Sequence, residues 1–289
     1  MDAIILGGDH TKEELYVTKV KVKGNKYILK LKKKYMGEYV LEALLKSEYI
    51  DRVVIVTDKS KFKKNYKSKK KIIVVNQKGK ITENFLEALE KIDYSSNKAI
   101  LVLACDIPLI TKDSVNLLIK EYKKYDSDIF IGLIPFKYFK GLLGLCVNNF
   151  QPVRIANNII YCEKVNGLIL KPKNIVTNNK LMHTAQIIYE NRELESFRKQ
   201  FQHTKFFPYI IKNYGLTGVL YAIYLYIVSR FLVNIGHNKS LYWLLPEKTD
   251  FEKKLSMKYK VNIGLVNDPS FSLDIDTESD RKGIEKILK

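Results

Sequence analysis

The chain has 289 residues, of which 46% are hydrophobic, a composition typical of a globular protein with one large core or two smaller ones. Its 50 lysines and arginines outnumber 31 acidic residues, and the net charge of +19 indicates a surface that attracts phosphates, nucleic acid or anionic lipid. Nucleic acid is disfavoured as a partner, because only six of the basic residues are arginine, the lysines are spread along the chain, and no nucleic-acid-binding signature is present.

The three cysteines and four histidines are scattered and show neither metal-site nor redox spacing. Asp2 follows Met1 directly and the apolar run after it is short, so we predict no signal peptide. A reducing cytoplasm is the expected compartment.

The first half of the chain alternates short apolar runs with amphipathic segments. Expected strands cover residues 3–6, 52–56, 72–75, 100–103 and 129–134, and expected helices cover residues 36–44, 85–92 and 115–122. This alternation predicts a mostly parallel sheet with right-handed crossovers. The fold class that we expect is α/β, a Rossmann-like three-layer sandwich.

The regular pattern fades after Pro135. Residues 159–161 and 168–170 predict a strand pair in a hairpin around Asn166-Gly167. Regular structure returns near the end of the chain. There we expect a strand over 261–266, a capping-box start at 277–280, and a last helix with Ile284, Ile287 and Leu288 facing inward. We therefore divide the chain into an α/β core (1–170), a mainly helical insertion (171–255) and a C-terminal return to the core (256–289).

Within the insertion, residues 184–201 look helical, and residues 216–233 form a mostly apolar, tyrosine-rich stretch. This stretch has three interpretations. It is a helix buried in the domain or against a second subunit of a homodimer, a helix lying in a membrane interface, or a membrane span. Its polar residues and minimal length disfavour a span. Peripheral membrane contact through residues 205–235 remains an alternative to the buried helix.

The expected first strand runs into Gly7-Gly8, a candidate phosphate loop because glycine lets a backbone approach a ligand and expose its N–H groups. No Gly-Lys-Ser/Thr follows, which excludes a Walker loop, and the spaced glycines of a dinucleotide fingerprint are absent. An ordinary turn is the alternative.

Asp106 lies where the buried strand at 100–103 ends, and Thr111 can cap the next helix. Pro108 pushes Ile107 out of the α region, so the carboxylate is held at the strand end. In open α/β sheets this edge binds ligands, and a rigid carboxylate there suits a magnesium ion that bridges phosphates. The alternative is that Asp106 only closes a turn.

Four blocks, taken in order, resemble the MobA-like NTP transferases, a nucleotidyltransferase family with a glycosyltransferase-A-like fold. They are the opening strand and glycine loop (3–8), the lysine segment with its following helix (25–29 and 38–44), the Asp-x-Pro-x-x-Thr segment (105–111), and the closing Asp-Ile-Asp-Thr signature (273–280). The resemblance implies a sheet of the nucleotide-diphospho-sugar transferase type. It hardly covers residues 140–260.

The resemblance also implies a magnesium site at Asp106 and Asp276, with Asp274 as the rival of Asp276. Lys26 would neutralise charge on the phosphates as the α-phosphorus is attacked, and Lys34 would assist. The remaining nucleotide-binding residues implied by the family are Leu6, Gly7, Gly8, Thr82 and Asn84, of which Thr82 or Asn84 would contact the base.

The implied activity is Mg²⁺-dependent transfer of an NMP group from an NTP to a phosphorylated small-molecule acceptor, with release of pyrophosphate. A glycosyltransferase of related fold is one alternative, and it would normally carry Asp-x-Asp at the end of a central strand. A non-catalytic nucleotide-binding or membrane-surface scaffold is another. It is motivated by Asp9-His10-Thr11 after Gly8, where the family usually has a Ser and an Arg or Lys, and by the apolar stretch 216–233. The acceptor and the base of the NTP are left open.

Overall fold

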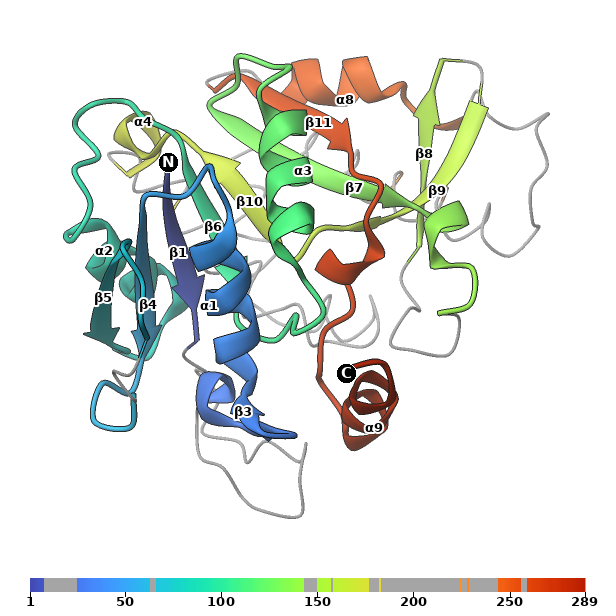
Figure 1. The fold of residues 1–289 in the computed structure, drawn as a ribbon. Helices are drawn as coiled ribbons and strands as arrows, with labels where there is room; N and C mark the ends of the chain where they lie inside the picture. Colours follow the sequence, from blue (N-terminus) through green and yellow to red (C-terminus); the bar gives the residue numbers. More distant parts are fainter. Residues whose placement is uncertain are drawn as a thin grey trace, which may run out of the picture.

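The computed structural model describes residues 1–7, 25–62, 66–142, 150–156, 158–176, 182, 224, 228, 244–255 and 259–288. These residues form a nine-stranded mixed sheet with helices on both faces and a smaller two-stranded sheet beside it (Figure 1). The predicted three-layer α/β class is confirmed.

One half of the main sheet is parallel. Its strands, in spatial order, are β5 (Lys71–Asn76), β4 (Arg52–Thr57), β1 (Asp2–Leu6) and β6 (Ile100–Ala104). Leu6 on β1 is level with Val56 on β4 and Ala104 on β6. The three central strands therefore end together, and the residues that follow them meet at one edge of the sheet.

The other half of the sheet is mixed. β10 (Gly167–Leu170) lies antiparallel between β6 and β7 (Ile129–Pro135). β7 also pairs with β11 (Val261–Leu265) in parallel and with β9 (Asn158–Lys164) antiparallel, and β9 pairs with β8 (Gln151–Ile155).

The predicted hairpin around Asn166-Gly167 is wrong, although both of its strands exist. β9 and β10 do not pair with each other, because β7 lies between them. A Cβ at position 167 would lie 2.5 Å from a methyl carbon of Leu103, so this glycine lets β10 approach β6 closely.

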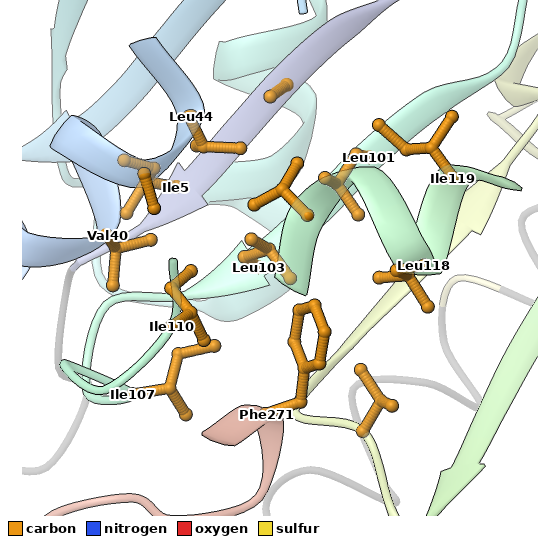
Figure 2. Close-up of a cluster of buried hydrophobic side chains, with 14 of the residues drawn as sticks. Ile5, Val40, Leu44, Leu101, Leu103, Ile107, Ile110, Leu118, Ile119 and Phe271 are labelled. Carbon is orange, nitrogen blue, oxygen red and sulfur yellow. The ribbon is translucent and has the colours of Figure 1, made fainter. Parts of the chain in front are cut away.

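The helices cover the two faces of the sheet. α1 (Met36–Lys46) and α3 (Lys112–Tyr122) pack on one face, and α2 (Ile81–Leu89) and α4 (Pro172–Val176) contribute to the core on the other. Alternate side chains of a strand serve alternate cores, as Leu103 does for the first and Val102 for the second. Figure 2 shows the first core, where Ile5 and Leu103 meet side chains of α1 and α3. Fully burying a side chain such as Leu103 contributes roughly 1.5–3 kcal/mol.

A third, smaller core joins the two ends of the chain. It lies between the hairpin of β2 (Lys30–Leu31) and β3 (Lys34–Tyr35), the start of α1 and the last helix, α9 (Glu278–Ile287). Its buried members are Leu29, Leu31, Met36, Ile275 and Ile284. We call this group the hairpin–α9 cluster.

The predicted capping box of α9 is confirmed, since Thr277 accepts from the Asp280 N–H and Asp280 accepts from the Thr277 N–H. Ile284 is buried as expected, but Ile287 is 40% exposed, so its predicted inward orientation is wrong. The described elements also include η2 (Phe136–Phe139) and α8 (Lys248–Leu255).

Most of the predicted helical insertion lies outside the described residues. This includes the helix expected over 184–201 and nearly all of the stretch 216–233, of which only Tyr224 and Val228 are described. Among the residues that are described, no helix is both long and apolar enough to cross a membrane.

Candidate active site

Asp106 follows β6 by two residues, at the carboxyl edge of the parallel strands. Its neighbours Ile107 and Ile110 are buried in the first core, and Phe271 of η4 (Pro269–Phe271) packs in the same cluster (Figure 2). Thr111 caps α3 as predicted, because its hydroxyl accepts from the Ser114 N–H. The backbone of Asp106 is thus fixed by β6 before it and by the buried Ile107 and Ile110 after it. This places its carboxylate at the edge of the sheet where ligands bind.

Lys26 reaches the same edge from η1 (Lys26–Ile28), a single turn of 3₁₀ helix. The backbone N–H of Tyr27 lies 3.4 Å from the carbonyl oxygen of Gly7, at the end of β1. Asn25 donates to the Thr57 hydroxyl at the end of β4, at 2.9 Å. Two central strands therefore hold the short segment that carries Lys26.

Asp274 and Asp276 come from the segment between η4 and α9. The N–H of Ile275 donates to the carbonyl oxygen of Asp106 at 3.1 Å, which ties this segment to the end of β6. The side chain of Ile275 is buried in the hairpin–α9 cluster. The two acidic residues flank a residue that is fixed from both its backbone and its side chain.

The structure brings the three carboxylates together. One carboxylate oxygen from each of Asp106, Asp274 and Asp276 lies within 4.8 Å of the others. Lys26 Nζ lies 2.9 Å from Asp106 Oδ2 and 2.5 Å from Asp276 Oδ1. The sequence left Asp274 as a rival of Asp276, and both residues reach the cluster.

The charges at this cluster influence one another strongly. Burial, followed by the nearby Asp106 and Asp276, raises the pKa of Asp274 to about 7. Burial alone would lower the pKa of Lys26, but attraction to Asp106 and Asp276 outweighs it and raises the pKa above its usual value. Lys26 therefore stays protonated, and the cluster carries excess negative charge that a divalent cation would neutralise. Three carboxylates are the hard oxygen ligands that Mg²⁺ prefers.

Gly7 is buried under the Lys26 segment. Its N–H donates to the Val56 carbonyl oxygen at 2.9 Å, so this amide is used inside the protein. A Cβ at position 7 would lie 2.8 Å from both Val56 O and Tyr27 Cβ. Glycine here allows η1 to pack onto β1 and β4. Leu6, which precedes it, is half-buried in the second core, and Gly8 lies outside the described residues.

Lys34 is joined to α1, because its Nζ lies 2.5 Å from Glu42 Oε1 and 5.4 Å from the centre of the Tyr39 ring. Glu42 is not one of the three carboxylates of the cluster, so this ion pair gives Lys34 a partner of its own.

Thr82 and Asn84 lie in the first turn of α2, after the carboxyl end of β5. Asn84 is buried, and its side-chain oxygen accepts from the Lys78 N–H at 2.6 Å. Thr82 is half-buried. Asn84 orders the turn before α2, and both residues sit on the same edge of the sheet as Asp106.

Two residues near the site carried no role in the sequence-based prediction. Asn25 and Thr57 are both buried, and together they attach η1 to β4. The available signal was weak: Thr57 is a polar residue at the end of the apolar run 53–56, and Asn25 directly precedes Lys26.

The hairpin–α9 cluster offers a test of how the carboxylates are held. Ile284→Ala is expected to lower the free energy of unfolding by about 2–5 kcal/mol, because Ile284 is fully buried beside Ile275. Ile287→Ala on the same helix is the matched control, with an expected loss below about 1 kcal/mol because Ile287 is 40% exposed. Urea denaturation of both variants measures the difference. Equal losses would contradict the packing described here.

The chain was compared with known proteins. Residues 18–153 match the model of the MobA-like NTP transferase domain. No curated protein matches the chain. A hypothetical transferase from Thermus thermophilus has a similar structure, with a TM-score of 0.63 and 16% identity, covering 97% of this chain and 99% of that one.

The 2-C-methyl-D-erythritol 4-phosphate cytidylyltransferase of Francisella tularensis is also similar, with a TM-score of 0.50 and 11% identity over 99% of both chains. At these identities the likeness concerns the fold, which is that of the nucleotide-diphospho-sugar transferases. The resemblance found in the sequence motifs is confirmed by this match: residues 18–153 are similar to the MobA-like NTP transferase domain.

Proposed function

We propose that the protein transfers an NMP group from an NTP to a phosphorylated small-molecule acceptor and releases pyrophosphate. The observation that carries this proposal is the meeting of Lys26 with Asp106, Asp274 and Asp276 at the carboxyl edge of the sheet. The match of residues 18–153 to an NTP transferase domain supports nucleotidyl transfer as the reaction class.

In the proposed reaction, an oxygen of the acceptor phosphate attacks the α-phosphorus of the NTP. The bond between this phosphorus and the bridging oxygen breaks, and pyrophosphate leaves. The attacking phosphate is already anionic, so the reaction needs no general base. Positioning and charge neutralisation can then supply most of the catalysis.

Lys26 is the residue that would act on the phosphates. Its ammonium group is protonated and held at the sheet edge, where it can donate to an α-phosphate oxygen and offset the charge that develops there. Asp106, Asp274 and Asp276 would hold a Mg²⁺ ion, which supplies further charge neutralisation to the α-phosphate and the leaving pyrophosphate.

Sugar transfer from a nucleotide sugar is the second candidate function. Asp274-Ile275-Asp276 is an Asp-x-Asp sequence, and both of its carboxylates lie in the cluster. It sits on the C-terminal segment, whereas the central strand β6 leads to the single Asp106. We therefore favour nucleotidyl transfer and keep nucleotide sugars as the comparison.

A thermal-shift panel tests the proposal without knowledge of the acceptor. The four NTPs and their common nucleotide sugars are each added with and without Mg²⁺. We expect one NTP to raise the melting temperature only when Mg²⁺ is present, since a ligand at 100 times its Kd stabilises the fold by about 2.7 kcal/mol. Stabilisation by a nucleotide sugar alone would favour sugar transfer. No stabilisation by any nucleotide would contradict nucleotidyl transfer and favour the membrane-surface scaffold.

A further inference from the structure

The residue directly before Lys26 is buried, and its side chain is hydrogen-bonded. Asn25 is 2% exposed, and its side-chain oxygen accepts from the Tyr27 N–H at 3.0 Å. Its amide nitrogen donates to the Thr57 hydroxyl at 2.9 Å, and that hydroxyl lies 3.2 Å from the Asn25 side-chain oxygen. Thr57 is fully buried at the end of β4. The two side chains satisfy each other across 32 positions of sequence.

The η1 segment has little local structure with which to fix Lys26. It is three residues long, and its backbone closes one turn through a bond from the Leu29 N–H to the Lys26 carbonyl oxygen. So short a 3₁₀ turn has poor hydrogen-bond geometry and depends on tertiary contacts. Those contacts are the Asn25–Thr57 pair on one side of Lys26 and the packing of Tyr27 against Gly7 and Gly37 on the other.

Burying two polar side chains costs free energy unless they are paired, so an apolar residue at either position would be the simpler way to fill this space. Thr57 follows four consecutive buried apolar residues of β4, and it provides a hydroxyl where Asn25 needs one. The arrangement fixes the backbone on which the Lys26 side chain depends. That side chain then spans Asp106 and Asp276.

We propose, building on the proposed function, that the Asn25–Thr57 pair is the positioning device for Lys26. It holds the ammonium group between Asp106 and Asp276 before the nucleotide arrives, and at the α-phosphate afterwards. While Lys26 is held there, it competes with a divalent cation for the same two carboxylates. Cutting the pair should therefore lower turnover and strengthen cation binding by the nucleotide-free protein.

Two variants, which we call the cutting variants, each remove the hydrogen bonds between the Asn25 and Thr57 side chains by changing one of the two residues. Thr57→Val keeps the shape of the side chain and removes its hydroxyl. Asn25→Ser keeps a helix-capping oxygen for the Tyr27 N–H but is too short to reach Thr57. Thr57→Ser retains the hydroxyl and is the conservative rescue. Ser47→Ala is the matched control, because Ser47 is also fully buried and its hydroxyl donates to the side chain of Asn116 on α3. Ser47 follows the C-terminal end of α1, whereas Tyr27 of η1 packs at its start.

The first readout is Mn²⁺ affinity of the nucleotide-free protein, measured by isothermal titration calorimetry. We expect Thr57→Val and Asn25→Ser to bind Mn²⁺ about two- to fivefold more tightly than wild type, as loss of a partly exposed ion pair would produce. Lys26→Met gives the upper reference for full loss of competition. Thr57→Ser and Ser47→Ala should match wild type.

The second readout is steady-state release of pyrophosphate from the NTP that the thermal-shift panel selects, with a panel of sugar phosphates and polyol phosphates as acceptors. The two cutting variants should lose about ten- to a hundredfold in kcat, with less change in KM for the NTP, because a displaced Lys26 is missed mainly in the transition state. Thr57→Ser should restore kcat. A general loss of stability would instead affect Ser47→Ala in the same way.

The outcomes separate the two proposals. Mn²⁺ affinity and kcat that stay at wild-type values in both cutting variants would overturn the positioning role while leaving the proposed function in place. Failure of wild type to bind any NTP in the presence of Mn²⁺ would overturn the proposed function itself.

Discussion

Asp106→Asn is expected to remove the Mg²⁺-dependent part of NTP binding and to lower nucleotidyl transfer by at least about a thousandfold. The amide keeps the size of the side chain but lacks the negative charge that a divalent cation needs, and a metal ion supplies several kcal/mol of charge stabilisation in such reactions. The backbone bond from Ile275 to the Asp106 carbonyl oxygen is unaffected, so the fold should persist. Thermal shift with the selected NTP, with and without Mg²⁺, measures the first effect.

Asp126→Asn is the control for this substitution. Asp126 also forms ion pairs, with Lys171 at 2.8 Å and with Lys260 at 3.3 Å, but it belongs to a separate charged group. It should keep the full Mg²⁺-dependent shift. If Asp106→Asn kept that shift as well, the carboxylate would have no part in binding the metal–nucleotide complex.

Lys26→Met is expected to lower kcat by about a hundred- to a thousandfold, the usual loss when a donor aimed at developing charge is removed. Methionine keeps the length and flexibility of the side chain, so the hydrocarbon part can stay packed. Binding of the Mg²⁺–NTP complex should fall less than kcat does, because the lysine acts mainly as charge builds up at the α-phosphate. Steady-state kinetics separates the two effects.

Lys171→Met provides the matched control, since Lys171 is also a partly buried lysine in an ion pair, with Asp126. Its kcat should remain near the wild-type value. An equal loss in both variants would show that removal of any paired lysine disturbs the enzyme, and a normal kcat in Lys26→Met would remove Lys26 from the proposed reaction.

The sequence predicts the parallel half of the sheet well, and for physical reasons. Strands such as β4 and β6 are buried on both faces, so they read as unbroken apolar runs. Caps at Thr111 and Thr277 are local, because the side chain bonds to a backbone group three residues away. Such signals need no knowledge of the rest of the fold.

The mixed half of the sheet is less predictable, because strand pairing is not local. Asn166-Gly167 resembles a hairpin turn, yet Gly167 serves the close approach of β10 to β6. β8 was not predicted at all. Ile287 fits the helical spacing of an inward residue but is exposed. The residues at this end of the chain that pack in or against the hairpin–α9 cluster are Ile284 and Leu288, and Ile287 is not among them.

In the candidate site, too, local features could be predicted from the sequence, whereas features that depend on distant contacts could not. Asp106 could be placed from its strand end and Pro108 alone. The choice between Asp274 and Asp276 could not be made, because it depends on how Ile275 is buried against residues near the other end of the chain. The Asn25–Thr57 pair joins two segments 32 positions apart, and such a contact cannot be predicted from a local sequence pattern.

The most direct test of the central claim is a crystal structure of the protein with Mn²⁺ and the NTP that stabilises it most. Anomalous scattering locates the metal without reference to the nucleotide. We predict a peak bound by Asp106, Asp274 and Asp276, with the triphosphate beside it and Lys26 within hydrogen-bonding distance of the α-phosphate. A nucleotide bound elsewhere, with Lys26 still paired to Asp106 and Asp276 and no metal among the three carboxylates, would contradict the proposed function.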